Sequence, residues 1–112
     1  GGADMAEKCS TELAIEIASR YSDVLKEHIN VDKLILFGSF AKNLQHQDSD
    51  IDIAVVSPDF TGDRVADQLS LMRYRRKVDL RIEPVPFRPQ DFIASNPFAK
   101  EIMDTGQVII ST

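Results

Sequence analysis

The chain has 112 residues, of which 43% are hydrophobic and 28% charged, so it is long enough and apolar enough to fold as one globular domain. Its formal net charge of −5 argues against strong nucleic-acid binding, and no apolar run approaches the ~20 residues of a membrane span. The single cysteine, Cys9, excludes a disulfide framework, has no histidine beside it to activate it as a nucleophile, and favours a cytoplasmic location.

Hydrophobic periodicity divides the first half of the chain into helical, extended and polar segments. Apolar residues recur at helical spacing after Ser10 and Thr11, which can cap a helix, and a continuous apolar run before Gly38 is typical of a buried strand. In chain order, we expect a helix over about residues 10–28, a strand over 33–37, a brief helix over 39–44, a polar loop over 45–49 and a strand over 50–56.

The second half of the chain alternates between helix and strand in the same way. Asp63 can cap a helix whose predicted apolar face includes Val65, Leu69 and Met72. In chain order, we expect that helix over 63–76, a strand over 78–83, a short helix over 88–95, a helix over 97–105 and a strand over 107–110.

The strand predicted over residues 78–83 alternates apolar and polar positions cleanly. Pro84 and Pro86 limit its extension and indicate either an edge position or the end of the strand. Because no repeat or linker interrupts these segments, residues 1–112 are predicted to form one α/β domain, of which residues 1–9 are expected to be disordered and in part derived from cloning.

Two acidic residues share one face of the strand predicted over 50–56. Side chains at i and i+2 of a strand point to the same face, so Asp50 and Asp52 lie side by side while the apolar residues between and after them face the core. Adjacent carboxylates repel each other, and a divalent cation removes that cost. Mg²⁺ prefers oxygen ligands and commonly uses one or two carboxylates together with substrate phosphates, so the pair predicts a magnesium site.

Asp79 is the natural third carboxylate. It points away from its apolar neighbours, which we expect to enter the core. If its strand pairs with that of Asp50 and Asp52, the three acids can converge on one face, where two metal ions ~4 Å apart would clamp the attacking and leaving oxygens of an in-line displacement. Glu83 shares the parity of Asp79 and is the weaker candidate.

A phosphate-binding element is predicted directly after the first strand. Gly38 lets the backbone approach a phosphate closely, and the start of the following helix directs free N–H groups outward. Ser39 adds a hydroxyl donor, and Lys42 lies about one turn further on, where it can reach a phosphate as a point charge. Together with the acids, this element predicts a site for a nucleoside triphosphate.

Each part of this set also has a purely structural interpretation. An Asp-x-Asp pair occurs in solvated strands, a Gly-Ser pair occurs in plain turns, and Asp79 could instead pair with Lys77 or Arg81 at an exposed strand end. The basic run of residues 73–77 could contact nucleic acid, although a solvated helix end is the favoured interpretation. It is the conjunction of all the parts in this order that favours the functional interpretation.

The residues Gly38-Ser39 and Ser49-Asp50-Ile51-Asp52 resemble the defining motif of the DNA polymerase beta-like nucleotidyltransferase superfamily. The compactness of the chain resembles the minimal branch of that superfamily, which implies a small mixed β-sheet flanked by helices. One departure is Asn43, which stands where the family usually has glycine. The resemblance implies metal binding by Asp50, Asp52 and Asp79, activation of the acceptor hydroxyl with the help of Asp79, and nucleotide binding by Gly38, Ser39, Lys42 and Ser49.

The resemblance implies an enzyme that uses Mg²⁺, with two ions in the active complex, to move NMP from an NTP to a hydroxyl with release of pyrophosphate. ATP is the expected donor, and the acceptor hydroxyl can belong to a partner protein, because minimal members resemble antitoxins paired with a small helical HEPN-type toxin. The alternative is an antitoxin-like binding subunit with little or no catalysis. A third interpretation is an acidic cation-binding domain without nucleotide chemistry.

Overall fold

The computed structural model describes residues 11–38 and 50–111. The segments predicted over residues 1–9, 39–44 and 45–49 therefore lie outside the described residues. In chain order the described elements are the helix α2 (Thr11–Lys26), the strands β1 (Lys33–Phe37) and β2 (Ile51–Val56), the helix α3 (Arg64–Arg75), the strand β3 (Ile82–Phe87), the short 3-10 helix η1 (Pro89–Asp91), the helix α4 (Pro97–Thr105) and the strand β4 (Gln107–Ser111).

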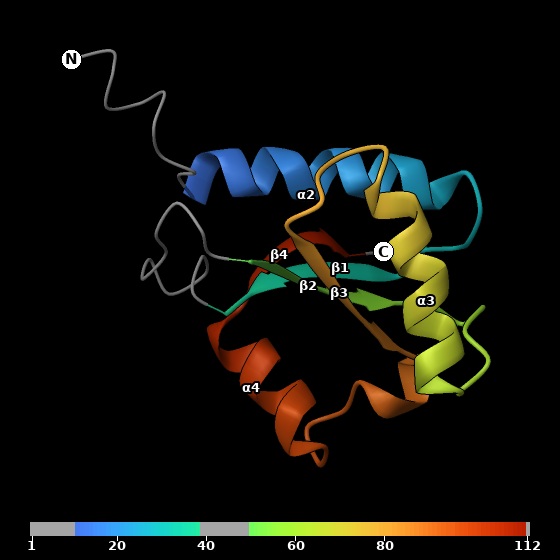
Figure 1. The fold of residues 1–112 in the computed structure, drawn as a ribbon. Coiled ribbons are helices and arrows are strands. Elements are labelled where there is room, and N and C mark those ends of the chain that lie inside the picture. The colour runs from blue at the N-terminus through green and yellow to red at the C-terminus, as the bar shows by residue number, and fades with distance from the viewer. Residues whose placement is uncertain (1–10, 39–49, 112) are drawn as a thin grey trace.

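The strands form one mixed sheet in the order β3-β2-β1-β4. The central strand β1 is antiparallel to both β2 and β4, whereas β2 and β3 run parallel. Helix α2 covers one face of the sheet and α4 covers the other, while α3 packs beside the edge strand β3 (Figure 1). This arrangement confirms the predicted α/β class and the mixed sheet flanked by helices. No helix among the described residues is long and apolar enough to cross a membrane.

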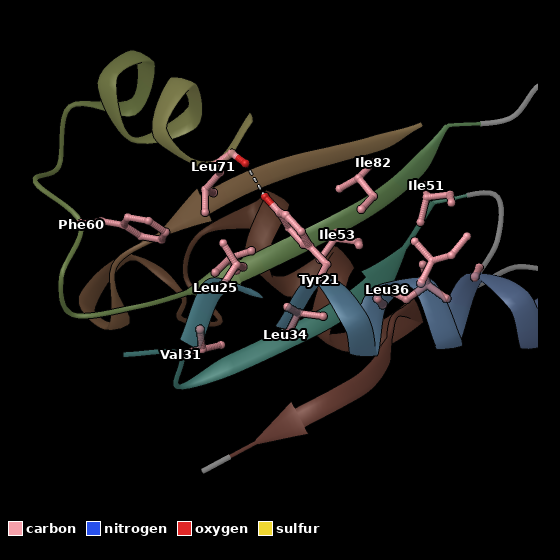
Figure 2. Close-up of a cluster of buried hydrophobic side chains, with 14 residues drawn as sticks. Tyr21, Leu25, Val31, Leu34, Leu36, Ile51, Ile53, Phe60, Leu71 and Ile82 are labelled. Atoms are coloured by element: carbon pink, nitrogen blue, oxygen red, sulfur yellow. Dashed lines mark hydrogen bonds between the residues drawn. The ribbon is translucent and has the colours of Figure 1, made fainter. Parts of the chain in front are cut away.

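The sheet separates two apolar clusters because side chains alternate along its strands. Leu34 and Leu36 of β1 and Ile53 of β2 face α2, where they form the larger cluster with Tyr21 and Leu71 (Figure 2). The opposite face of the same strands packs against α4 and contributes a second cluster, which comprises Ile35, Ala54, Val56, Phe87, Phe92, Ala99 and Ile102. The second cluster lies on the face of the sheet that also carries Asp52.

The apolar row predicted for α3 does not face the core. Val65 and Leu69 are 69% and 55% exposed, whereas Leu71 is fully buried on the other side of the helix. Hydrophobic periodicity did not identify the inner face of α3 because that face includes a charged residue. The buried carboxylate of Asp67 accepts hydrogen bonds from the backbone N–H groups of Thr61 and Gly62 and from the Thr61 hydroxyl, so it anchors the loop that precedes the helix.

Leu71 also provides a hydrogen bond between helices. The hydroxyl of the buried Tyr21 donates to the Leu71 carbonyl oxygen at 2.6 Å (Figure 2). Burial raises the pKa of this hydroxyl far above its ordinary value, which keeps the Tyr21 donor protonated.

We expect Leu71→Ala to lower the free energy of unfolding by ~2–5 kcal/mol, because the substitution leaves a cavity in the core between α2 and α3. Leu69→Ala is the matched control: it removes the same atoms from an exposed position on the same helix and should change stability by less than ~0.5 kcal/mol. Urea denaturation of both variants measures the difference. Equal losses would mean that the faces of α3 are assigned wrongly.

The strand predicted over residues 78–83 is also wrong, because residues 78–81 form the turn that follows α3. The backbone N–H groups of Val78 and Asp79 donate to the carbonyl oxygen of Arg75, so the chain stays close to the helix end. Strand β3 begins at Ile82 instead and continues through both prolines to Phe87. The predicted edge position is confirmed.

The two prolines are tolerated because β3 has a partner on one side only. The carbonyl oxygens of Arg81 and Phe87 accept from N–H groups of β2 and of the residue that follows it. Hydrogen-bonding direction alternates along a strand, so Pro84 and Pro86 turn the positions of their missing N–H groups away from β2.

The remaining boundaries agree closely with the sequence. The side chain of Asp63 accepts from the N–H groups of Val65 and Ala66 at the start of α3, and Asn96 caps α4 in the same way. The short helix predicted over 88–95 is reduced to η1, because the N–H groups of Asp91 and Phe92 close single turns onto Arg88.

Candidate active site

The acidic pair lies where β1 ends and β2 begins. Asp52 is the second residue of β2, and its Cα partner is Phe37 on β1 and Glu83 on β3. Because Asp52 is two residues from the buried Ala54, it points to the face of the sheet that α4 covers. Asp50 precedes the strand and is exposed. Three acidic residues therefore come from the same end of two neighbouring strands.

Asp52 is in an environment that disfavours its negative charge. Burial, followed by the nearby carboxylates of Asp50 and Glu83, raises the pKa of Asp52 from 3.8 to about 6. Burial and like charge act in the same direction, and a bound cation would oppose both. This is the electrostatic signature of a site that is completed by positive charge.

Gly38 is required at its position for two separate reasons. Its φ angle is +74°, which side chains of L residues rarely adopt. A Cβ atom at this position would also collide with the carboxylate of Asp52, whose Cγ would be only 3.1 Å away. The glycine therefore lets the end of β1 pass directly beside the Asp52 carboxylate, so a phosphate bound at Gly38 would lie close to a cation bound at Asp52.

We expect Gly38→Ala to destabilise the domain by ~1–3 kcal/mol and to displace Asp52, because both the backbone and the carboxylate must shift. Gly62→Ala is the matched control, since Gly62 also has a positive φ (+94°) but its Cβ would meet only the flexible end of Arg88. Denaturation measures stability, and Mn²⁺ titration measures the acidic site. A loss of Mn²⁺ affinity that is equal in both variants would contradict this role for Gly38.

Asp79 does not join the acidic pair in this structure. It lies in the turn before β3, where its carboxylate accepts two hydrogen bonds from the Arg81 guanidinium, at 3.0 Å from Nε and 2.8 Å from Nη2. The hydrogen bond to Arg81 lowers the pKa of Asp79. The expected convergence depended on a strand over residues 78–83, and the pairing with Arg81 is the alternative that the sequence left open. The geometry of Asp79 fits a residue that orients Arg81.

Glu83 occupies the position that the sequence assigned to Asp79. It is the Cα partner of Asp52, and the two residues are next to each other on the parallel strands β2 and β3. The alternation of side chains along one strand made Glu83 only the second candidate for the third acid. The register between β2 and β3 makes it the first candidate, and a single sequence does not contain that register. Its carboxylate lies 3.6 Å from Nη1 of Arg75, which also donates to the Ile82 carbonyl oxygen at 2.9 Å.

The described residues partly fit a divalent metal ion. Asp50 and Asp52 supply carboxylate oxygens, the ligands that Mg²⁺ prefers, and a bound cation would oppose the effects that raise the pKa of Asp52. Within residues 11–38 and 50–111, however, no three His, Cys, Asp or Glu side chains are close enough to hold a metal ion together. The carboxylate of Glu83 is instead paired with Arg75. The predicted nucleotide-binding residues Ser39, Lys42 and Ser49, and also Asn43, lie outside the described residues.

Comparison with protein families identifies the fold and its chemistry. A family model described as polymerase beta, nucleotidyltransferase matches residues 20–112, which is most of the chain. The chain belongs to this nucleotidyltransferase family. It is 26% identical over 96 residues to the "putative protein adenylyltransferase" of Methanocaldococcus jannaschii, and the match covers 85% of this chain and 92% of that protein. The domain is a nucleotidyltransferase, as the sequence predicted.

Solved structures share the same fold. A crystal structure of a "putative nucleotidyltransferase" from Sulfolobus solfataricus superposes with a TM-score of 0.63 at 16% identity and covers 88% of this chain and 80% of that one. A crystal structure of a toxin–antitoxin with AMP-PNP gives 0.59 at 23% identity, with coverage of 85% and 73%. The toxin–antitoxin MntA–HpeT, in a mutant form, gives 0.58 at 22% identity, with the same coverage. The mixed sheet and its helices are thus those of the nucleotidyltransferase fold.

Proposed function

We propose that the domain transfers AMP from ATP to a hydroxyl group, with Mg²⁺ and with release of pyrophosphate. The observation that carries this proposal is the position of Asp52, which lies between Gly38 and Glu83 with its pKa raised by burial and by neighbouring acids. The choice of AMP is supported by the adenylyltransferase relative and by the fold neighbour solved with AMP-PNP. Because ATP is a cytoplasmic metabolite, we place the protein in the cytoplasm.

In this proposal Asp50 and Asp52 hold the metal ions, and two ions act in the active complex. The ions supply neutralisation of the triphosphate charge and polarisation of the reacting oxygens. Glu83 replaces Asp79 as the third acid, next to the acceptor. Asp79 instead holds Arg81 in the turn that precedes β3. Gly38 provides the close approach to phosphate, together with Ser39, Lys42 and Ser49.

We further propose that the acceptor hydroxyl belongs to a partner protein. This proposal is supported by the relative named a "putative protein adenylyltransferase" and by two fold neighbours that are toxin–antitoxin structures. A small helical HEPN-type protein is the partner expected from the family resemblance. Among the described residues, Asp50, Asp52 and Glu83 lie at the same end of the strands β2 and β3.

The alternative is a binding subunit that masks a partner protein with little or no catalysis. One observation favours it: Glu83 is paired with Arg75, and the acids of the described residues do not converge on one point. The enzyme requires that substrate binding releases Glu83 from Arg75, whereas a binding subunit does not require this release.

The two functions are separated by incubating the protein with Mg²⁺, a partner encoded by an adjoining gene, and ATP labelled at either the α- or the γ-phosphate. Transfer of AMP labels the partner from α-labelled ATP only and releases one pyrophosphate for each label. Label from the γ-position would indicate a kinase and contradict the proposal. A stable complex with neither label would support the binding subunit.

A further inference from the structure

Helix α3 carries a row of apolar side chains on the face turned away from the core. Val65 and Leu69 are 69% and 55% exposed, and Met72 is partly exposed. The spacings of four and three residues place these three side chains on one line along the helix, and Arg76 continues that line. The core-facing residues Leu71 and Asp67 lie on the opposite side. We define the outer face of α3 as Val65, Leu69, Met72, Arg73 and Arg76. It joins an apolar row to two arginines, and within residues 11–38 and 50–111 its exposed apolar side chains are not buried by another element.

The C-terminal half of this outer face is hollowed and positively charged. Leu69, Met72, Arg73, Arg75 and Arg76 line a hollow of about 340 Å³. Arg73 and Arg76 form no ion pair with any of the described residues, although the chain as a whole carries a net charge of −5. A row of apolar side chains that ends beside two guanidinium groups fits a ligand that is apolar along one line and acidic next to that line.

The charges select among the possible occupants. A second copy of this chain, docked through the same face about a two-fold axis, would bring no acidic side chain of that face against Arg73 and Arg76, because the outer face contains none. Nucleic acid would meet an overall charge of −5, and the hollow contains no aromatic side chain on which a base could stack. An amphipathic protein helix with acidic residues beside its apolar row can pack its apolar side chains on the row of α3 and pair its acids with the guanidinium groups of Arg73 and Arg76.

We propose that the outer face of α3 docks an acidic amphipathic helix of a partner protein. Arg75 connects this face to the acids: it lines the hollow, and its Nη1 lies 3.6 Å from Glu83. As a second step, the docked protein also supplies the acceptor hydroxyl, because Glu83 is the strand partner of Asp52. That second step, in which the docked protein is the acceptor, rests on the proposed function, whereas the docking itself does not.

The test selects binders from a displayed library of helical peptides, with a Leu69→Asp/Arg76→Glu variant used to remove peptides that bind elsewhere. The enriched peptides are expected to carry apolar residues at spacings of three and four with Glu or Asp beside them. In fluorescence anisotropy, they should lose at least ~10-fold affinity for Leu69→Asp and for Arg73→Glu/Arg76→Glu. Replacing their acids by lysine should restore binding to the Arg73→Glu/Arg76→Glu variant.

The matched controls are Val108→Asp, which introduces the same charge at a 56% exposed valine on β4, and Lys26→Glu, which reverses an exposed charge at the end of α2. Both should bind the peptides normally, and circular dichroism should show all variants folded. Peptides without acids, equal losses in the controls, competition by an RNA oligonucleotide, or dimerisation of the wild type through α3 would each overturn the proposal. Asp52→Asn should retain peptide binding, so a failure of AMP transfer leaves the docking result intact.

Discussion

Asp52→Asn is expected to lower AMP transfer by at least ~10³-fold, which corresponds to losing several kcal/mol of charge stabilisation by metal. The reason is that Asp52 is the acid that lies beside Gly38 and is the strand partner of Glu83. The same substitution should remove the stabilisation that Mg²⁺ or Mn²⁺ gives the folded chain, because a ligand that binds only the folded state raises the free energy of unfolding. Transfer is measured with α-labelled ATP and stabilisation by thermal denaturation with and without metal.

The control for this substitution is Asp104→Asn, which removes a carboxylate from an exposed ion pair on α4. This control should retain both transfer and the response to metal, because an exposed pair contributes little to stability. Asp50→Asn should resemble Asp52→Asn. An unchanged metal response in both Asp50→Asn and Asp52→Asn would contradict the proposed metal site.

Without metal, Asp52→Asn should stabilise the domain at neutral pH. The folded chain holds the Asp52 proton up to about pH 6, whereas the unfolded chain releases it near 3.8. The folded state therefore binds more protons between these values, and the free energy of unfolding falls as the pH rises through that window. The variant escapes this loss and should be more stable above pH 6 by ~1–2 kcal/mol, which is less than the full shift gives because solvent screens the charge. Denaturation at pH 4 and pH 7 measures the difference, which should nearly vanish at pH 4.

Elements that depend on local chemistry could be predicted from the sequence. The apolar run of residues 33–37 stopped by Gly38 is β1. Asp63 and Asn96 cap α3 and α4 because short side chains at a helix start accept hydrogen bonds from the first free N–H groups, whatever the rest of the fold does. The acidic pair on β2 could be recognised for a similar reason, since parity along one strand is fixed by the backbone.

Features that depend on packing between elements could not be predicted in this way. Helix α3 has apolar residues on two faces, and the choice between them depends on where the sheet and α2 lie. Residues 78–81 alternate like a strand, yet two hydrogen bonds to the carbonyl oxygen of Arg75 fold them against the helix end. The assignment of the third acid then followed from that misplaced strand, because a shift in the strand's start changes which acid lies opposite Asp52.

Glu83→Gln is expected to lower AMP transfer by ~10²-fold or more while Asp79→Asn retains most of it, which reverses the order that the sequence suggested. Glu83 is the strand partner of Asp52, and a carboxylate beside the attacking oxygen acts mainly in the transition state. Glu83→Gln should therefore reduce kcat with little change in the affinity for ATP. Asp79→Asn should instead loosen Arg81, whose guanidinium it holds through two hydrogen bonds, and should alter KM more than kcat.

Arg75 gives this comparison a second and independent measurement. Because its guanidinium lies 3.6 Å from the Glu83 carboxylate, Arg75 competes with a metal ion for that acid. Arg75→Gln should raise the affinity for Mn²⁺ by ~2–5-fold, the range expected for breaking a partly exposed ion pair. Part of any gain comes from removing a positive charge near the site, and that part persists when Glu83 is also changed to Gln. The part that disappears in the double variant measures competition for Glu83 itself. Full transfer by Glu83→Gln, together with a gain that is the same in both backgrounds, would remove Glu83 from the site and return Asp79 to it.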